Sequence, residues 1–312
     1  MRNIGFVFPG QGAQKLGMLA DLAASTDVVT DTFAEASAVL GKDLWEVSQI
    51  DQSEQLNQTD ITQPALLAAS VAIWRVWQGR QGVQPSILAG HSLGEYSALV
   101  CSGVLIFSDA IALVHQRGRL MQAAVSVGTG KMAAIIGFDD SKIAGLCEQA
   151  ACGQVVSAAN FNSPGQTVIA GDVDAVERTM ALCKEAGAKR ALPLNVSVPS
   201  HCALMRPAAE QLQAELDKVQ FSSPQIPVVQ NVNAQICDDP NLIKENLIKQ
   251  LYEPVLWVDS VKCMGESGVE KILECGPGKV LSGLIKRIEP DISCFASDSP
   301  EGLTSAIAEL SS

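Results

Sequence analysis

Residues 90–94 read Gly-His-Ser-Leu-Gly, a G-x-S-x-G pattern that can present the hydroxyl of Ser92 as a nucleophile. A short apolar run over residues 86–90 predicts a buried strand, and a helical pattern begins just past Ser92. Glycine at both ends of the pattern tolerates the dihedral angles and the close approach that a sharp strand-to-helix turn requires. The unpaired N–H groups of the following helix would face an oxyanion at this turn. The pattern therefore predicts nucleophilic attack by Ser92.

Ser92 and Glu95 also match S-x-x-E, the capping box that starts a helix without any catalytic role. The preceding strand and the two glycines favour the nucleophile, because an ordinary cap needs neither feature. Ser92 could also combine both roles, with its backbone starting the helix and its hydroxyl free. The sequence alone leaves both interpretations open.

A serine hydroxyl is a weak nucleophile and needs a base within hydrogen-bonding distance. The chain has three histidines, so excluding two of them as the base identifies the third as the candidate. His91 is the sequence neighbour of Ser92 and should diverge from it at a sharp turn, whereas His115 lies within a predicted helix. His201, in a Pro-Ser-His loop at an expected domain junction, is the candidate base, and the alternative is a loop histidine without a role. A backbone carbonyl could orient its second ring nitrogen.

Two further polar residues are candidates for substrate binding. Arg117 is expected on the apolar side of a helix, where a cation needs a partner that either a substrate or a structural ion pair could provide. Gln11 follows a predicted strand at residues 4–8, at the end where open α/β sheets bind ligands, and the alternative is a turn residue in water. The loop after this strand does not fit the dinucleotide pattern G-x-G-x-x-G, because Lys15 stands at its sixth position.

Strands and helices alternate along the chain, which predicts an α/β fold with a largely parallel, covered sheet. Between residues 126 and 197 the expected order is β-α-β-β-α-β, that of a ferredoxin-like unit. We therefore expect a small domain at 126–197 inserted into a large domain formed by residues 1–125 and 198–312. Helices are expected at residues 16–40, at 64–78 with Pro64 in the first turn, and at 108–121 with Ser108 as the cap.

The composition narrows the range of partners and compartments. The chain has 312 residues and a formal net charge of −12, which argues against nucleic acid as the main partner. Its nine cysteines form no C-x-x-C pair, which favours buried thiols in a reducing compartment over a disulfide frame or a metal site. The N-terminus carries no secretory pattern and no apolar run is long enough to cross a bilayer, so we expect a cytoplasmic protein with no membrane partner.

Short motifs are spread over essentially the whole chain. They are Phe-Pro-Gly-Gln-Gly at 8–12, Gly-His-Ser-Leu-Gly-Glu at 90–95, Gln-Arg-Gly at 116–118, Asn-Phe-Asn-Ser-Pro-Gly at 160–165, Val-Pro-Ser-His at 198–201 and Gly-Pro-Gly at 276–278. In order and separation this set resembles the malonyl-CoA:acyl carrier protein transacylases of bacterial fatty-acid synthesis. G-x-S-x-G alone is not specific, but the joint match is.

The resemblance implies a role for several residues of this chain. Ser92 is the acylated nucleophile and His201 is its base. The backbone N–H of Leu93, together with Gln11, forms the oxyanion hole. The carbonyl that orients the histidine belongs to Gln250.

The resemblance also implies the reaction and its partners. The donor is malonyl-CoA, the acceptor is the phosphopantetheine thiol of acyl carrier protein, and no metal or redox cofactor is required. Arg117 falls at the position of the carboxylate-binding arginine, whose guanidinium can hold a free carboxylate through two hydrogen bonds. The implied fold is an α/β-hydrolase-like large domain with a ferredoxin-like insertion.

Three alternatives stay open. The first is an acyltransferase with a broader acyl-CoA range, because Ser200 precedes His201 where related polyketide synthase domains often have an aromatic residue. The second is a serine hydrolase or thioesterase that passes acyl groups to water. The third is a non-catalytic carrier-protein or scaffold module.

Overall fold

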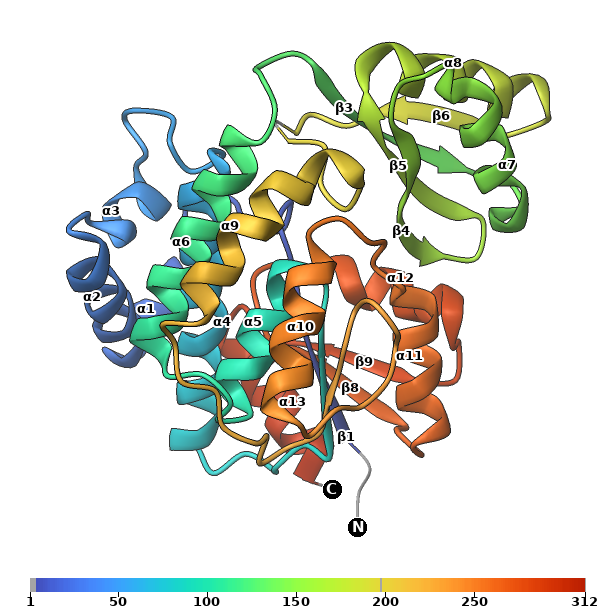
Figure 1. Ribbon diagram of the computed structural model, residues 1–312. Helices are drawn as coiled ribbons and strands as arrows, with labels where there is room; N and C mark the ends of the chain where they lie inside the picture. The colour runs from blue at the N-terminus through green and yellow to red at the C-terminus, as the bar shows by residue number, and fades with distance from the viewer. Residues whose placement is uncertain (1–3, 197, 312) are drawn as a thin grey trace.

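The computed structural model describes residues 4–196 and 198–311 and contains two β-sheets (Figure 1). The larger sheet has five strands in the order β7-β2-β1-β8-β9, and every neighbouring pair is parallel. The expected α/β class with a parallel sheet is therefore confirmed. The strands are β1 (Ile4–Phe8), β2 (Ile87–Gly90), β7 (Val228–Val229), β8 (Lys271–Glu274) and β9 (Ser293–Ala296).

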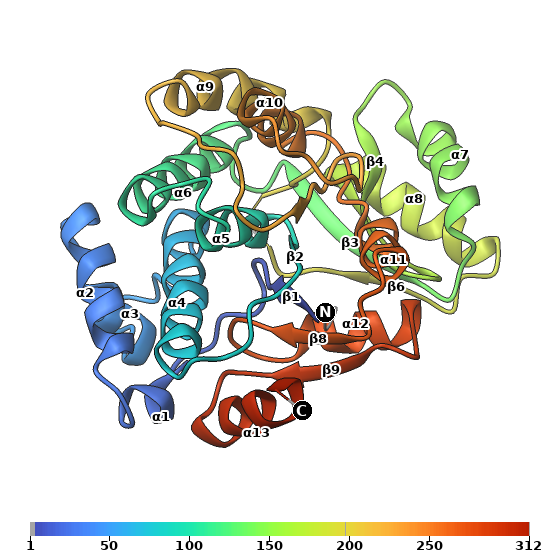
Figure 2. The ribbon, with the colours of Figure 1, turned by 90° about the horizontal axis from the view of Figure 1, so that it is seen from below.

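Helices cover both faces of this sheet, and Figure 2 shows α4 (Thr59–Gly79), α5 (Leu93–Cys101) and α6 (Phe107–Ala123) on one side and α11 (Trp257–Glu266) and α12 (Val280–Ile288) on the other. In β1, Phe6 and Phe8 pack in the core with α4, α5 and α6, whereas Val7 packs in the core with α11 and α12. Successive side chains of a strand point to opposite faces, so an unbroken apolar strand fits only a sheet covered on both sides.

The helix expected over residues 16–40 is wrong as a single element. The chain instead forms α1 (Ala20–Ala23) and α2 (Val28–Leu40). Between them the hydroxyl of Ser25 donates to the carbonyl of Leu22, and the hydroxyl of Thr26 accepts from the N–H of Val28. Such local bonds compete with the helical ladder and explain the break.

The other helices outside the second sheet are α3 (Leu44–Gln49), a 3-10 turn (Ala203–Met205), α9 (Arg206–Leu216), α10 (Pro240–Gln250) and α13 (Pro300–Ser311). Within the described ranges, no helix combines the length and the apolar character needed to cross a membrane.

The expected start of α4 is also wrong, because the helix begins at Thr59 and Pro64 lies inside it. Proline has no N–H, so the carbonyl of Asp60 lacks its helical donor. The Nδ1 atom of His115 on α6 lies 2.8 Å from this carbonyl oxygen and replaces that donor. Gly118 allows the close approach, since a Cβ there would overlap the backbone of Asp60. His115 therefore connects α6 to α4 through this hydrogen bond.

Helix α6 begins at Phe107 rather than at the expected Ser108. The N-cap position falls on Ile106, and no side chain caps the helix. Burial of the apolar face of the helix stabilises it without the cap, because tertiary packing outweighs a single cap bond.

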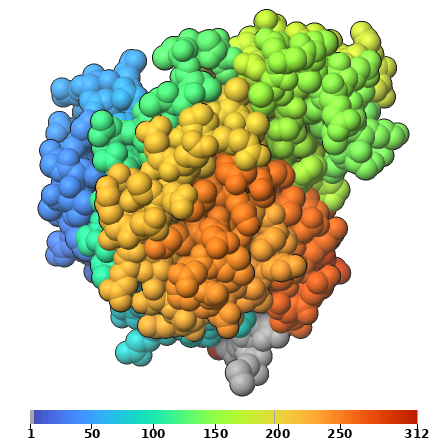
Figure 3. All heavy atoms as spheres, in the orientation of Figure 1, coloured from blue at the N-terminus to red at the C-terminus, as the bar shows by residue number. Residues whose placement is uncertain are grey.

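The second sheet has four antiparallel strands in the order β4-β5-β3-β6, and it forms the lobe at the upper right of Figure 3. Helices α7 and α8 cover one of its faces, while Met132, Ala134, Val168 and Ala170 on the other face pack with Cys202. Ser197, the last residue of the small domain expected at 126–197, lies outside the described residues. The elements in chain order are β3 (Gly130–Ile136), α7 (Asp140–Ala151), β4 (Val156–Ser163), β5 (Gln166–Asp172), α8 (Val173–Glu185) and β6 (Arg190–Pro193).

We expect Gly94→Ala to lower the free energy of unfolding by more than about 2 kcal/mol. A Cβ at this position would overlap the carbonyl oxygen of Phe8, so α5 would have to move away from β1. Gly145→Ala is the matched control, since Gly145 lies in α7 with open space around it, and it should raise stability by up to about 1 kcal/mol. Denaturant titration of both variants measures the difference, and equal stabilities would contradict the close contact.

Candidate active site

Ser92 lies at a strained corner between β2 and α5. Its backbone has φ 52° and ψ −109°, in the left-handed half of dihedral space that residues other than glycine seldom occupy. Its N–H donates to Oδ1 of Asn231 at 2.7 Å, and the N–H of His91 donates to the carbonyl of Phe8 at 3.0 Å. A Cβ on Gly90 would overlap the backbone of Gly94. The two glycines and these bonds hold the corner in place.

The capping-box interpretation of Ser92 and Glu95 is wrong. Ser92 occupies the N-cap position of α5, but its side chain makes no capping bond. The carboxylate of Glu95 accepts instead from Gln250 and from the backbone of Asn231. The hydroxyl of Ser92 is therefore available for another partner.

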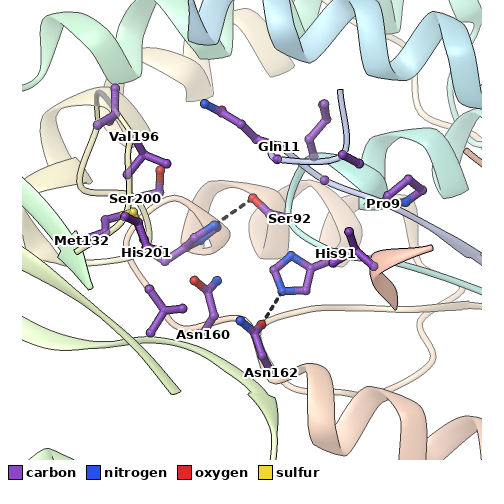
Figure 4. A pocket seen from close by; sticks show the side chains of 18 of the residues that line it. Pro9, Gln11, His91, Ser92, Met132, Asn160, Asn162, Val196, Ser200 and His201 are labelled. Atoms are coloured by element: carbon purple, nitrogen blue, oxygen red, sulfur yellow. Dashed lines mark hydrogen bonds between the residues drawn. The ribbon is translucent and has the colours of Figure 1, made fainter. Parts of the chain in front are cut away.

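The partner of the Ser92 hydroxyl is His201, and Oγ lies 2.8 Å from Nε2 (Figure 4). On the other side of the ring, Nδ1 lies 2.6 Å from the carbonyl oxygen of Gln250. Gln250 is the last residue of α10, where carbonyls lack helical donors. Because a carbonyl only accepts, the hydrogen resides on Nδ1 and Nε2 can accept the serine proton.

The surroundings of His201 keep its ring neutral. Burial and, next to it, the nearby positive charge of Arg117 lower the pKa of His201 to about 3. The backbone bond to Gln250 opposes this shift. A neutral imidazole is the form that can take a proton from a hydroxyl.

Arg117 is 1% exposed on α6, and its guanidinium reaches the same point as the serine. Nη1 donates to Oε1 of Gln63 at 2.8 Å, while Nη2 donates to Oε1 of Gln250 at 2.9 Å and to Oγ of Ser92 at 3.4 Å. These partners are neutral, and the ring of Tyr96 lies 5.4 Å away. Burial lowers the pKa of Arg117, yet guanidinium stays protonated in proteins. The arginine therefore presents a buried positive charge beside the Ser92 hydroxyl.

Leu93 and Gln11 lie close to this corner. Leu93 is the first residue of α5, so its N–H has no acceptor within the helix. Gln11 is exposed in the loop after β1, and its side-chain amide donates to Oγ1 of Thr59 at 3.4 Å. Both residues line the cavity that contains Ser92.

The cavity has a volume of about 220 Å³ and lies between the two sheets. The second sheet contributes Met132, Asn160 and Val168, and α12 contributes Leu281 and Leu284. Most of these side chains are apolar, so an acyl chain and a linker could enter with few competing water contacts.

His91 diverges from Ser92, as the sharp turn predicts. Its Nε2 lies 2.8 Å from Oδ1 of Asn162 on β4 (Figure 4). The ring of His91 also meets the ring of Trp257 edge-on. Burial lowers the pKa of His91. His91 therefore links the corner to the second sheet, while Ser92 faces His201.

A model of the acyl transferase domain family matches residues 5–287. The chain belongs to this family. Malonyl CoA-acyl carrier protein transacylases from Salmonella typhimurium and Bacillus subtilis are 58% and 42% identical to it, over 99% of this chain and 100% and 98% of theirs.

Solved structures related to this acyltransferase chain agree with that assignment. An acyl carrier protein S-malonyltransferase from Vibrio cholerae superposes with a TM-score of 0.95 at 60% identity, over 97% of this chain and 99% of that one. A malonyl-transacylase in complex with its type II PKS acyl-carrier protein superposes with a TM-score of 0.97 at 57% identity, over 98% and 99%.

Two residues of the acyltransferase site were missed in the sequence. Asn231 accepts from the N–H of Ser92 and donates to the carbonyl of Gly90 at 2.6 Å, and Gln63 holds the guanidinium of Arg117. Asn231 is the second residue after the apolar strand β7, and a polar amide at that end of a parallel strand is a usable signal. The signal at Gln63 is weaker, since it is only a polar residue within a buried apolar helix.

Within residues 4–196 and 198–311, no cluster of His, Cys, Asp or Glu could hold a metal ion.

We expect the ring of His201 to stay neutral, with its hydrogen on Nδ1, when the pH is lowered to 5. Its pKa of about 3 lies below the ordinary 6.5, so folding stability linked to this group is present above pH 6.5 and is lost as the pH falls toward 3. Imidazole nitrogen shifts in NMR spectra of the wild type measure both properties, and His201→Gln identifies the signal. A titration midpoint near 6.5 would contradict the buried site.

Proposed function

We propose that this chain transfers the malonyl group from malonyl-CoA to the phosphopantetheine thiol of an acyl carrier protein, as in fatty-acid biosynthesis. The observation that carries the proposal is the buried guanidinium of Arg117, held by neutral amides 3.4 Å from the Ser92 hydroxyl. A malonyl thioester has its reactive carbonyl two bonds from a free carboxylate, so one molecule can meet both groups. The names of relatives at 58% and 42% identity support the same reaction.

The first half-reaction acylates Ser92. As Oγ attacks the thioester carbonyl, Nε2 of His201 takes the hydroxyl proton. The backbone N–H of Leu93, together with Gln11, stabilises the negative oxygen of the tetrahedral intermediate. The C–S bond then breaks, His201 returns the proton to the CoA sulfur, and a malonyl ester of Ser92 remains.

The second half-reaction repeats these steps with a different thiol. His201 takes the proton from the phosphopantetheine thiol, and the sulfur attacks the malonyl ester. The bond to Oγ breaks, and His201 returns the proton to Ser92. Throughout, the carbonyl of Gln250 keeps the Nδ1 hydrogen in place and stabilises the imidazolium that forms.

Arg117 selects the acyl group. A guanidinium binds a carboxylate through two parallel hydrogen bonds, which an acetyl group cannot form. A neutral acyl group leaves the buried charge without this partner, so the site discriminates against it.

The fold proposal is an α/β-hydrolase-like large domain, residues 1–125 and 198–312, with a ferredoxin-like small domain at 126–197. The strand order β4-β5-β3-β6, reached through β-α-β-β-α-β, supports the ferredoxin-like part. The strand-corner-helix arrangement at Ser92 supports the hydrolase-like part. All nine cysteines are free thiols, which supports a cytoplasmic location.

Incubation with malonyl-CoA should add one malonyl group to the protein, and the group should leave when acyl carrier protein is added. Ser92→Ala removes the attacking oxygen and should abolish the adduct. Ser97→Ala, a matched change on the same helix, should retain it, since the Ser97 hydroxyl is buried without a partner. Intact-mass spectrometry measures the adduct. Free malonate without an adduct would indicate a hydrolase, and a wild type that neither gains the adduct nor releases malonate would indicate a scaffold module.

Arg117→Ala should lower kcat/KM for malonyl-CoA by at least about 30-fold, because a buried charged hydrogen-bonding partner is lost. Acetyl-CoA should become favoured relative to malonyl-CoA, since it has no carboxylate to lose. Arg119→Ala removes an exposed arginine of the same helix and should leave the preference of the wild type. Steady-state transfer with both donors measures the preference, and an unaltered value in Arg117→Ala would remove Arg117 from this role.

A further inference from the structure

Glu95 is a buried carboxylate beside the reacting groups that the mechanism above does not use. It is 1% exposed and lies on α5, one turn after Ser92. Its Oε2 atom accepts from Nε2 of Gln250 at 2.7 Å and from the N–H of Asn231 at 3.2 Å. Both donors belong to residues that also bond to Ser92. Glu95 is therefore connected to the reacting groups through its hydrogen bonds.

Gln250 serves the site with two different groups. Its backbone carbonyl holds His201 and is fixed by the end of α10. Its side-chain oxygen accepts from Arg117 at 2.9 Å, whereas its side-chain nitrogen donates to Glu95 and to the carbonyl of Ser92. An amide can rotate by half a turn, and the reversed orientation would place NH₂ against the guanidinium, donor against donor.

The Glu95 carboxylate, together with the carbonyl of Ser92, favours the observed orientation over the reversed one. An ionised carboxylate only accepts hydrogen bonds, so the nitrogen of the Gln250 amide must face it and the oxygen must face Arg117. Burial raises the pKa of Glu95, and the opposing bonds from Gln250 and Asn231 and the charge of Arg117 limit the rise to about 7. The ionised carboxylate and the oriented amide therefore stabilise each other.

We propose that Glu95 is a positioning residue that, through the side chain of Gln250, holds the guanidinium of Arg117 ready for the malonyl carboxylate. The inference rests on the proposed function. Its consequence is selective, because acetyl transfer needs the Ser92–His201 pair but not the oriented guanidinium. The backbone carbonyl that holds His201 does not depend on the rotation of the Gln250 amide.

The test is the ratio of Ser92 acylation rates with malonyl-CoA and acetyl-CoA, measured by single-turnover mass spectrometry on one preparation. Glu95→Gln should lower this ratio about 10-fold, because the neutral amide weakens the bond from Gln250 and can present NH₂ as well as oxygen to it, so one orientation is no longer enforced. Both rates scale with the folded fraction, so the ratio is independent of stability. Glu274→Gln, the same change at a buried carboxylate that caps α12, should leave the ratio unchanged.

Combination with Arg117→Ala shows whether Glu95 acts through Arg117. The double variant should have the ratio of Arg117→Ala alone, because the orienting group has nothing left to orient. A wild-type ratio in Glu95→Gln, or a further fall in the double variant, would overturn the inference. Should Glu95→Gln not fold, Glu95→Asp carries the same expectation, since its carboxylate is one methylene too short. Absence of a malonyl adduct in the wild type would instead overturn the proposed function.

Discussion

The corner at Ser92 is the constraint on which the rest of the site depends. A residue with a side chain occupies a backbone conformation that favours glycine, and it stays there because neighbouring elements hold it on every side. Asn231 braces the N–H of Ser92 and the carbonyl of Gly90, while Gly94 lets α5 lie against the end of β1. The strain keeps the hydroxyl out of the helix cap, which leaves it free to face His201.

The polar groups around this corner are buried, and amides connect them. One residue, Gln250, makes hydrogen bonds with Glu95, Arg117, His201 and the backbone of Ser92. The side-chain oxygens of Gln63 and Gln250 accept from Nη1 and Nη2 of Arg117 without neutralising its charge, while the buried Nε has no hydrogen-bond partner. Burial and, to a smaller extent, this charge lower the pKa of His201, which keeps its ring unprotonated in the resting site.

Much of the fold followed from periodicity, and each error has an identifiable physical cause. The parallel sheet follows from buried apolar strands alternating with helices. The misplaced starts of α4 and α6 arose because tertiary packing tolerates Pro64 inside a helix and replaces the cap expected at Ser108. His115 shows the compensation, since its ring supplies the hydrogen bond that Pro64 cannot make.

The sequence by itself determined the serine corner and, by elimination among few histidines, its partner, because glycine spacing and rare residue types carry local information. The role of Gln250 was predicted only from a family resemblance. Every residue has a backbone carbonyl, so residue type does not show which carbonyl contacts His201. Asn231 and Gln63 are common amides that lie far from Ser92 along the chain. Only the folding of parallel strands and covering helices brings them to one point, and that convergence depends on packing rather than on any local pattern.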